Sequence, residues 1–174
     1  VPSTISKLNI PDIPKGTINP TTLGMVLGAL IPENAIVVDE SVTTGREFFY
    51  QTAGSHPHTW LNNCGGSIGF GMPVAIGAAI SCPDRKVISL EGDGSAMYTV
   101  QSLWTMAREN LDIVVLIFAN QSYKILQGEL TNVGVVNPGK SAMEMLSLQD
   151  PSLDWVSLSK GMGVDAVRVD NLED

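Results

Sequence analysis

The longest unbroken run of apolar residues constrains the fold most strongly. Ile113–Ala119 contains seven apolar residues in succession, and Ala35–Val38 and Val87–Leu90 are shorter runs of the same kind. Strands that are apolar on both faces are typical of parallel sheets, because helices cover both sides. A glycine-rich apolar helix is expected over Gly69–Ile80, and an amphipathic helix over Ser95–Asn110. This alternation predicts an α/β fold, a parallel sheet with helices on both faces.

Weaker patterns predict the other elements. Further helices are expected over Thr21–Leu30, twice within Tyr123–Leu148 and over Leu153–Gly161, and a last strand over Val164–Val169. On the amphipathic helix, Met97, Leu103 and Trp104 are expected in the core. Residues 1–19, rich in proline and polar side chains, are expected to be a linker from a preceding domain. Residues 20–174 are expected to form one domain that lacks its last helix and strand.

Composition excludes several classes of function. The 174 residues carry a net charge of -8, which argues against nucleic-acid binding. Only 16% of residues are charged, so part of the surface is expected to pack against another domain or chain. Two cysteines, Cys64 and Cys82, fit a reducing cytoplasm. Thr59–Cys82 is uncharged but interrupted by glycine, asparagine and proline, so we expect a strand end, a glycine loop and a buried helix, not a membrane span.

Polar clusters follow three of the predicted strands, at Asp39–Thr44, Gly92–Ser95 and Asn120–Ser122. Ligands of open α/β sheets bind beyond the carboxyl ends of the strands. If the strands before Asp93 and Asn120 are neighbours, they lie about 4.8 Å apart and these side chains can converge. Carboxylate and amide oxygens suit Mg²⁺ or Ca²⁺, and glycines followed by a helix start suit phosphate. The sequence therefore predicts a metal-bridged diphosphate.

Two motifs carry a family resemblance. Gly92-Asp93-Gly94, followed after 25 residues by Asn120, resembles the thiamine diphosphate motif. The segment GGSIGFGMPVAIGAA, Gly65–Ala79, resembles the segment that this family places before it. From about Thr21 onward, the chain resembles the C-terminal, diphosphate-binding domain of the acetolactate synthase and benzoylformate decarboxylase group.

The resemblance implies a role for each matching residue. Asp93 and Asn120 would ligate Mg²⁺ by side chain, and Ser122 by its main-chain carbonyl. The cofactor-binding residues would be Ser41, Val42, Thr43, Gly66, Ile68, Gly92, Gly94, Ser95 and Tyr123. Among these, Gly66 would accept a hydrogen bond from the cofactor's amino group, and Ile68 would hold the cofactor bent. Ile125 and Leu126 either line the substrate pocket or pack in the core.

The resemblance also implies an activity. Such enzymes decarboxylate a 2-oxo acid and then protonate the product or join it to a second carbonyl compound. The segment SYKILQGEL after Asn120 favours an acetolactate synthase; a benzoylformate decarboxylase-like enzyme is the alternative. The activating glutamate would belong to the N-terminal pyrimidine-binding domain of the same or a neighbouring chain, in a homodimer or homotetramer. The 174 residues alone are expected to be inactive, and any FAD would bind elsewhere in the complete protein.

Some residues depart from the family pattern. Ala119 stands where the family often has a first asparagine, and Glu91 where an apolar residue or glutamine is usual. Nothing in the sequence accounts for Glu91. Glu40 is expected to be either structural or close to the cofactor.

Three alternative functions have weaker support in the sequence. Gly65-Gly66-Ser67-Ile68-Gly69 fits the G-x-S-x-G motif of serine hydrolases, but both histidines precede the serine, against the usual order. A nicotinamide fingerprint fails because Val74 occupies its third glycine position. A non-catalytic cofactor-domain module is the remaining alternative.

Overall fold

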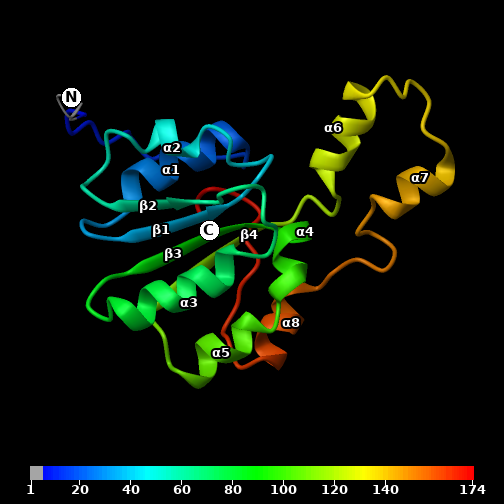
Figure 1. Cartoon of the computed structure of the whole chain (residues 1–174). Coiled ribbons are helices and arrows are strands. Elements are labelled where there is room, and N and C mark those ends of the chain that lie inside the picture. Colours follow the sequence, from blue (N-terminus) through cyan, green and yellow to red (C-terminus); the bar gives the residue numbers. More distant parts are fainter. Residues whose placement is uncertain (1–5) are drawn as a thin grey trace.

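A four-stranded parallel sheet, ordered β2-β1-β3-β4, forms the centre of the computed structural model, which describes residues 6–174 (Figure 1). The strands are β1 (Ile36–Glu40), β2 (Thr59–Asn62), β3 (Val87–Gly92) and β4 (Ile113–Phe118). The helices are α1 (Pro20–Leu30), α2 (Phe48–Gln51), α3 (Gly71–Ser81), α4 (Asp93–Ala96), the 3-10 turn η1 (Met97–Thr99), α5 (Ser102–Arg108), α6 (Lys124–Asn132), α7 (Lys140–Met145) and α8 (Trp155–Gly161). The predicted parallel α/β fold is confirmed.

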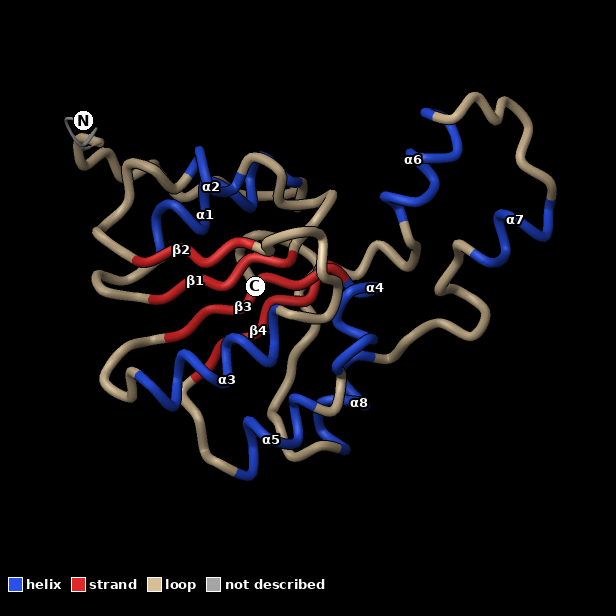
Figure 2. The backbone as a smooth tube through the Cα atoms, viewed as in Figure 1, coloured by secondary structure: helices blue, strands red, loops and turns tan. Residues whose placement is uncertain are grey.

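Helices cover both faces of the sheet, as predicted (Figure 2). Ile36 and Val38 of β1 point to the face covered by α3 and α5, where Met72 and Leu103 are buried. Val37 points to the opposite face, where the buried residues of α1 and α2 include Leu27 and Phe48. This alternation puts apolar side chains of one short strand into both cores, which explains its continuous apolar sequence.

The amphipathic region after β3 forms three short pieces instead of the single helix predicted over Ser95–Asn110. The break falls around Thr99, whose hydroxyl donates a hydrogen bond to the carbonyl of Gly69 at 3.1 Å. Leu103 is buried and Met97 half-buried, whereas Trp104 is 53% exposed, so its assignment to the core is wrong. The Arg108 guanidinium lies 5.2 Å from the Trp104 ring centre, where a cation–π contact stabilises the aromatic face outside the core.

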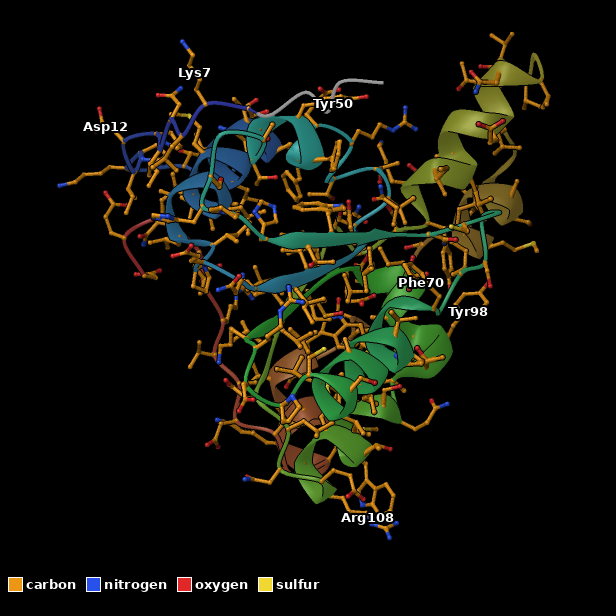
Figure 3. The ribbon with its side chains drawn as sticks, turned by 60° about the vertical axis from the view of Figure 1, so that its left-hand side comes forward. Lys7, Asp12, Tyr50, Phe70, Tyr98 and Arg108 are labelled. Carbon is orange, nitrogen blue, oxygen red and sulfur yellow. The ribbon has the colours of Figure 1, made fainter. Side chains whose placement is uncertain are left out.

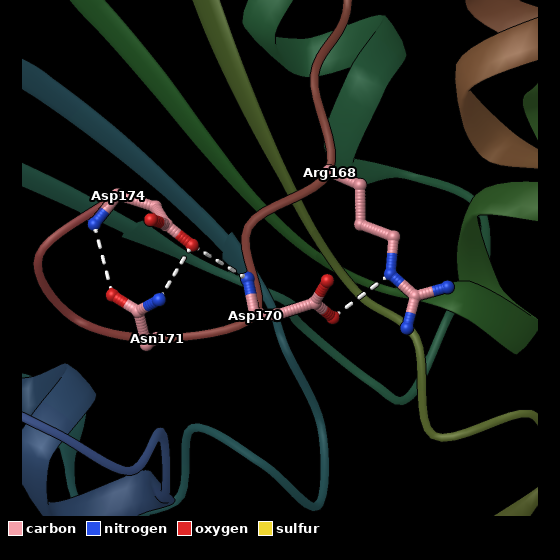
Figure 4. Close-up of polar contacts among 4 residues, drawn as sticks. All are labelled: Arg168, Asp170, Asn171 and Asp174. Atoms are coloured by element: carbon pink, nitrogen blue, oxygen red, sulfur yellow. Dashed lines mark hydrogen bonds and ion pairs between the residues drawn. The ribbon is translucent and has the colours of Figure 1, made fainter.

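The strand predicted over Val164–Val169 does not form. Val164 packs against the core, but Val167 is 84% exposed and the segment joins no strand of the sheet. The chain instead reaches the segment before α1, where Thr17 forms an antiparallel bridge with Asn171. Figure 4 shows how the following turn is held: the Asn171 side chain accepts a hydrogen bond from the Asp174 N–H and donates one to the Asp174 carboxylate.

The other segments follow the expectations more closely. The two short helices predicted within Tyr123–Leu148 are α6 and α7, which project from the body of the molecule (Figure 1). The described part of the expected linker is neither helix nor strand, and the N–H of Asn9 donates to the carbonyl of Gly54 at 2.7 Å. Its first five positions lie outside the described residues. No helix within residues 6–174 has both the length and the apolar character to cross a membrane.

Candidate functional site

The carboxyl ends of β1, β3 and β4 meet at one pocket. Its lining is contributed by the three polar clusters that follow these strands: Ser41, Val42, Thr43, Thr44, Gly92, Asp93, Gly94, Ser95, Asn120, Ser122, Tyr123, Lys124 and Ile125. The clusters converge because β1 pairs with β3 and β3 with β4, all in parallel, so that their ends lie at the same edge.

Asp93 joins the ends of two strands. It lies directly after β3 and is 2% exposed. One carboxylate oxygen accepts a hydrogen bond from the N–H of Gln121 at 2.6 Å, and the other from the N–H of Gly94 at 2.9 Å. Burial raises the pKa of Asp93 above its usual value, while these two N–H groups favour the charged form. The carboxylate is therefore held at the pocket before any ligand arrives.

The other two residues predicted to bind metal lie in the loop after β4. The side-chain oxygen of Asn120 accepts hydrogen bonds from the N–H of Ser122 at 3.0 Å and its hydroxyl at 3.2 Å. Within residues 6–174, no cluster of three His, Cys, Asp or Glu side chains is placed to hold a metal. The predicted set contains one carboxylate, an amide and a carbonyl, which are hard oxygen donors that suit Mg²⁺ completed by phosphate and water.

Gly92 and Gly94 form a glycine cradle, a stretch of backbone without side chains that lines this pocket. A Cβ atom on Gly94 would lie 2.8 Å from two ring carbons of Tyr123, closer than packed carbon atoms approach. On the β1 side, Ser41 is buried, and its N–H and hydroxyl donate to the Asp39 carboxylate at 3.0 and 2.5 Å. Small buried residues and close backbone therefore surround the predicted diphosphate position, which fits a phosphate-bearing group.

Gly66 and Ile68 do not line this pocket. They lie on the loop between β2 and α3, where Gly65 and Gly66 have φ angles of 74° and 68° that favour glycine. Ile68 is 40% exposed. Of the two weaker predictions, Ile125 lines the pocket, whereas Leu126 is not among its lining residues and is 47% exposed.

Two buried glutamates directly precede the pocket residues Ser41 and Gly92: Glu40 on β1 and its register partner Glu91 on β3. Glu91 is fully buried, and the Ser89 hydroxyl donates to one of its oxygens at 2.6 Å. Burial raises the pKa of Glu91 to about 8, against the effect of Ser89, and the negative charges of Glu40 and Asp39 raise it further. Glu91 is thus protonated at neutral pH and brings no negative charge to a bound diphosphate.

The serine-hydrolase alternative finds no support in the described residues. Both backbone groups of Ser67 are bound by the Asn63 side chain, and no hydrogen bond joins Ser67 to His56 or His58. The ring of His58 instead bonds the carbonyl of His56. Ser67 therefore lacks the base that a nucleophilic serine needs.

The fold and the site define a class, an α/β domain with a pocket at parallel strand ends that suits a phosphate-bearing ligand. Residues 44–174 match the family model "Thiamine pyrophosphate enzyme, C-terminal TPP binding domain". The chain belongs to this family, and the predicted resemblance is confirmed.

Several relatives support the assignment. The chain is 48% identical over 165 residues to IlvX of Mycobacterium tuberculosis, which is named as a candidate acetolactate synthase large subunit. The match covers 94% of this chain and 32% of that protein. It is 33% identical to benzoylformate decarboxylase of Pseudomonas aeruginosa, over 91% of this chain and 29% of that protein. The thiamine diphosphate-dependent 4-hydroxybenzoylformate decarboxylase of Rhodococcus jostii superimposes with a TM-score of 0.76 at 29% identity, covering 100% of this chain and 32% of that chain. This chain spans about a third of the length of these relatives.

Proposed function

We propose that residues 20–174 form the C-terminal cofactor domain of a thiamine diphosphate- and Mg²⁺-dependent enzyme that acts on 2-oxo acids. The favoured reaction is acetolactate formation from two molecules of pyruvate with loss of CO₂. The observation that carries the proposal is the convergence of Asp93, Asn120 and Ser122 with the glycine cradle at one pocket. The 48% identity to IlvX supports the acetolactate synthase class.

The chain's own residues would bind and orient the cofactor. Asp93, Asn120 and the carbonyl of Ser122 would hold Mg²⁺, and Ser41–Thr43, Gly92, Gly94, Ser95 and Tyr123 would surround the diphosphate. When bound, thiamine diphosphate supplies a carbon nucleophile and a cationic ring that accepts the electron pair left behind when CO₂ departs. The carbonyl of Gly66 would accept a hydrogen bond from the cofactor's amino group, and Ile68 would hold the rings at a reactive angle.

The remaining parts of the active site would come from elsewhere in the assembly. A pyrimidine-binding domain, of the same chain or a neighbouring one, would supply the activating glutamate, which implies a homodimer or homotetramer. A benzoylformate decarboxylase-like reaction is the second candidate, favoured by the superposition on the Rhodococcus jostii enzyme. Incubating the complete protein with pyruvate or benzoylformate separates the two, because acetolactate or benzaldehyde would accumulate.

The metal assignment is tested by the substitution Asp93→Ala. Removing the buried carboxylate deletes the only anionic protein ligand of the proposed set, so Mg²⁺-dependent binding of thiamine diphosphate should be abolished. Isothermal titration of the complete protein with thiamine diphosphate, with and without Mg²⁺, measures the effect.

Asp84→Ala is the matched control, because Asp84 is exposed on the turn before β3. The control should bind the cofactor as tightly as the unaltered protein. Unchanged Mg²⁺-dependent affinity in Asp93→Ala would refute the metal site.

A further inference from the structure

Glu40 is buried at the end of β1 and binds the segment that leads into α3. Its side chain is 2% exposed. One carboxylate oxygen accepts a hydrogen bond from the N–H of Gly69 at 2.5 Å and the other from the N–H of Gly71 at 2.6 Å. Gly71 is the first residue of α3, where the N–H has no partner within the helix. Both oxygens of the Glu40 carboxylate thus accept hydrogen bonds from the backbone of residues 69–71.

A second side chain closes the preceding part of this loop. The side-chain oxygen of Asn63 accepts a hydrogen bond from the N–H of Ser67 at 3.0 Å, and its amide donates to the carbonyl of Ser67 at 2.9 Å. The bidentate contact joins the two ends of a five-residue turn that contains Gly65 and Gly66. Ile68 is therefore the only residue between the contact of Asn63 at Ser67 and that of Glu40 at Gly69.

The helical segment after β3 holds the loop from the other side. The hydroxyl of Thr99 donates to the carbonyl of Gly69 at 3.1 Å, and a Cβ atom on Gly69 would lie 2.7 Å from the Cβ of Tyr98. Figure 3 shows Tyr98 and Phe70 close together at this end of the molecule. Gly69 is thus held on both sides: Glu40 of β1 accepts from its N–H, and Thr99 of η1 donates to its carbonyl.

We propose that Glu40, assisted by Asn63, is a positioning residue that sets the loop carrying Gly66 and Ile68 before the cofactor binds. This inference rests on the proposed function. Glu40 does not line the pocket; it would act through the N–H groups of Gly69 and Gly71. A buried carboxylate that accepts two N–H bonds is a stiff support, because losing either bond leaves a buried donor unpaired.

The proposal separates two parts of cofactor binding. The residues assigned to the diphosphate follow β1, β3 and β4, whereas those assigned to the organic rings lie on the loop after β2. Loosening the loop should weaken binding of thiamine diphosphate and leave Mg²⁺-dependent binding of inorganic diphosphate unchanged. A general loss of folding would weaken both.

The experiment uses Glu40→Gln and Asn63→Ala in the complete protein. Glutamine keeps the shape of glutamate but points an NH₂ group at one of the two N–H donors. Asn63→Ala removes the other contact at a residue that does not line the pocket. Without cofactor, hydrogen exchange of residues 65–71, measured by mass spectrometry, should become about tenfold faster or more, as expected for loss of a charge-assisted hydrogen bond. The dissociation constant of thiamine diphosphate should rise roughly tenfold, while that of inorganic diphosphate with Mg²⁺ stays the same.

Glu33→Gln is the matched control, because Glu33 is exposed and the change in charge is identical. Faster loop exchange with selective loss of thiamine diphosphate affinity in either variant, but not in the control, supports the proposal. Unchanged affinity for thiamine diphosphate in both variants overturns it. An equal loss of affinity for thiamine diphosphate and inorganic diphosphate in both variants also overturns it. If the unaltered protein binds neither ligand, the proposed function itself fails.

Discussion

At the scale of single residues, Glu91 shows how a carboxyl group can lie next to a proposed phosphate site without opposing it. Its side chain is fully buried between Ser89 and the carboxylate of Glu40. A charged form there would be poorly solvated and repelled by neighbouring acids, so the neutral form dominates at neutral pH. The unusual residue before Gly92 therefore belongs to the support of the site and not to its ligand-binding surface.

The raised pKa of Glu91 predicts a pH-dependent stability. The pKa rises from the ordinary 4.5 to about 8 in the folded protein. Unfolding releases the proton at any pH between these values, so this contribution is complete below pH 4.5 and is lost as the pH rises to about 8. One pKa unit corresponds to about 1.4 kcal/mol, so the loss should reach a few kcal/mol.

Glu91→Gln should remove this dependence, because glutamine stays neutral and can still accept from Ser89. Urea unfolding without metal, repeated from pH 4.5 to pH 8.5, measures the difference in unfolding free energy between variant and unaltered protein. As the pH rises, the unfolding free energy of the variant should increase relative to that of the unaltered protein. A difference that is constant across the range would contradict a neutral Glu91, and Glu33→Gln again serves as the control.

Ile68 makes a separate prediction about the reactive geometry. Ile68→Ala should slow exchange of the cofactor's C2 proton, because a small side chain cannot hold the two rings close. The diphosphate should remain anchored, since Asp93 and Gly94 are unaltered. Quenched-flow exchange in deuterated water, followed by NMR of the released cofactor, gives the rate; a normal rate would rule out the proposed role of Ile68. Val133→Ala, at a side chain 74% exposed beyond α6, is the control.

The residue scale also shows where prediction from sequence stops. Asp93 and Asn120 could be placed together because each follows an apolar run, and neighbouring parallel strands end at one edge. The contacts of Glu40 and Asn63 could not be predicted, because a side chain that binds a backbone N–H needs no particular residue type at the partner position. Glu40 reaches partners 29 and 31 residues away, a separation that leaves no periodic pattern.

At the scale of elements, continuous apolar runs are the reliable guide. The apolar runs became β1, β3 and β4, because apolar contacts on both faces require such runs. Val164–Val169 is also rich in valine, yet it is interrupted by Asp165 and Arg168, Val167 and Val169 are exposed, and no strand pairs with it. α2 went unpredicted because a helix of four residues shows barely one turn of periodicity.

This short helix nevertheless anchors one face of the sheet. Phe48 of α2 is completely buried, and its ring centre lies 5.5 Å from that of Phe118 on β4, edge to face. Phe48→Ala should reduce the unfolding free energy by about 3–5 kcal/mol, through lost burial and the cavity left behind. Denaturant unfolding followed by circular dichroism measures this loss.

The adjacent Phe49 supplies the control for this prediction. Phe49 is 49% exposed, so Phe49→Ala should cost about 1 kcal/mol or less. Equal losses in the two variants would mean that α2 does not anchor the core through Phe48.

At the scale of the whole molecule, the proposed function makes this chain one part of a larger active site. The described residues bring oxygen ligands and a glycine cradle to one edge of the sheet. Of their two buried glutamates, Glu40 accepts backbone N–H groups with both oxygens, and Glu91 accepts the Ser89 hydroxyl with one. Neither side chain lines the pocket, which supports the proposal that the activating glutamate belongs to another domain.

The 174 residues by themselves should therefore bind without turning over substrate. With thiamine diphosphate and Mg²⁺, the isolated chain should release no CO₂ from pyruvate or benzoylformate, whereas the complete protein should release it from one of them. Release of labelled CO₂ measures both, and the Asp93→Ala form of the complete protein sets the background. Turnover by the isolated chain at the rate of the complete protein would mean that these residues hold the activating acid, since a contribution from another domain could then have no kinetic effect.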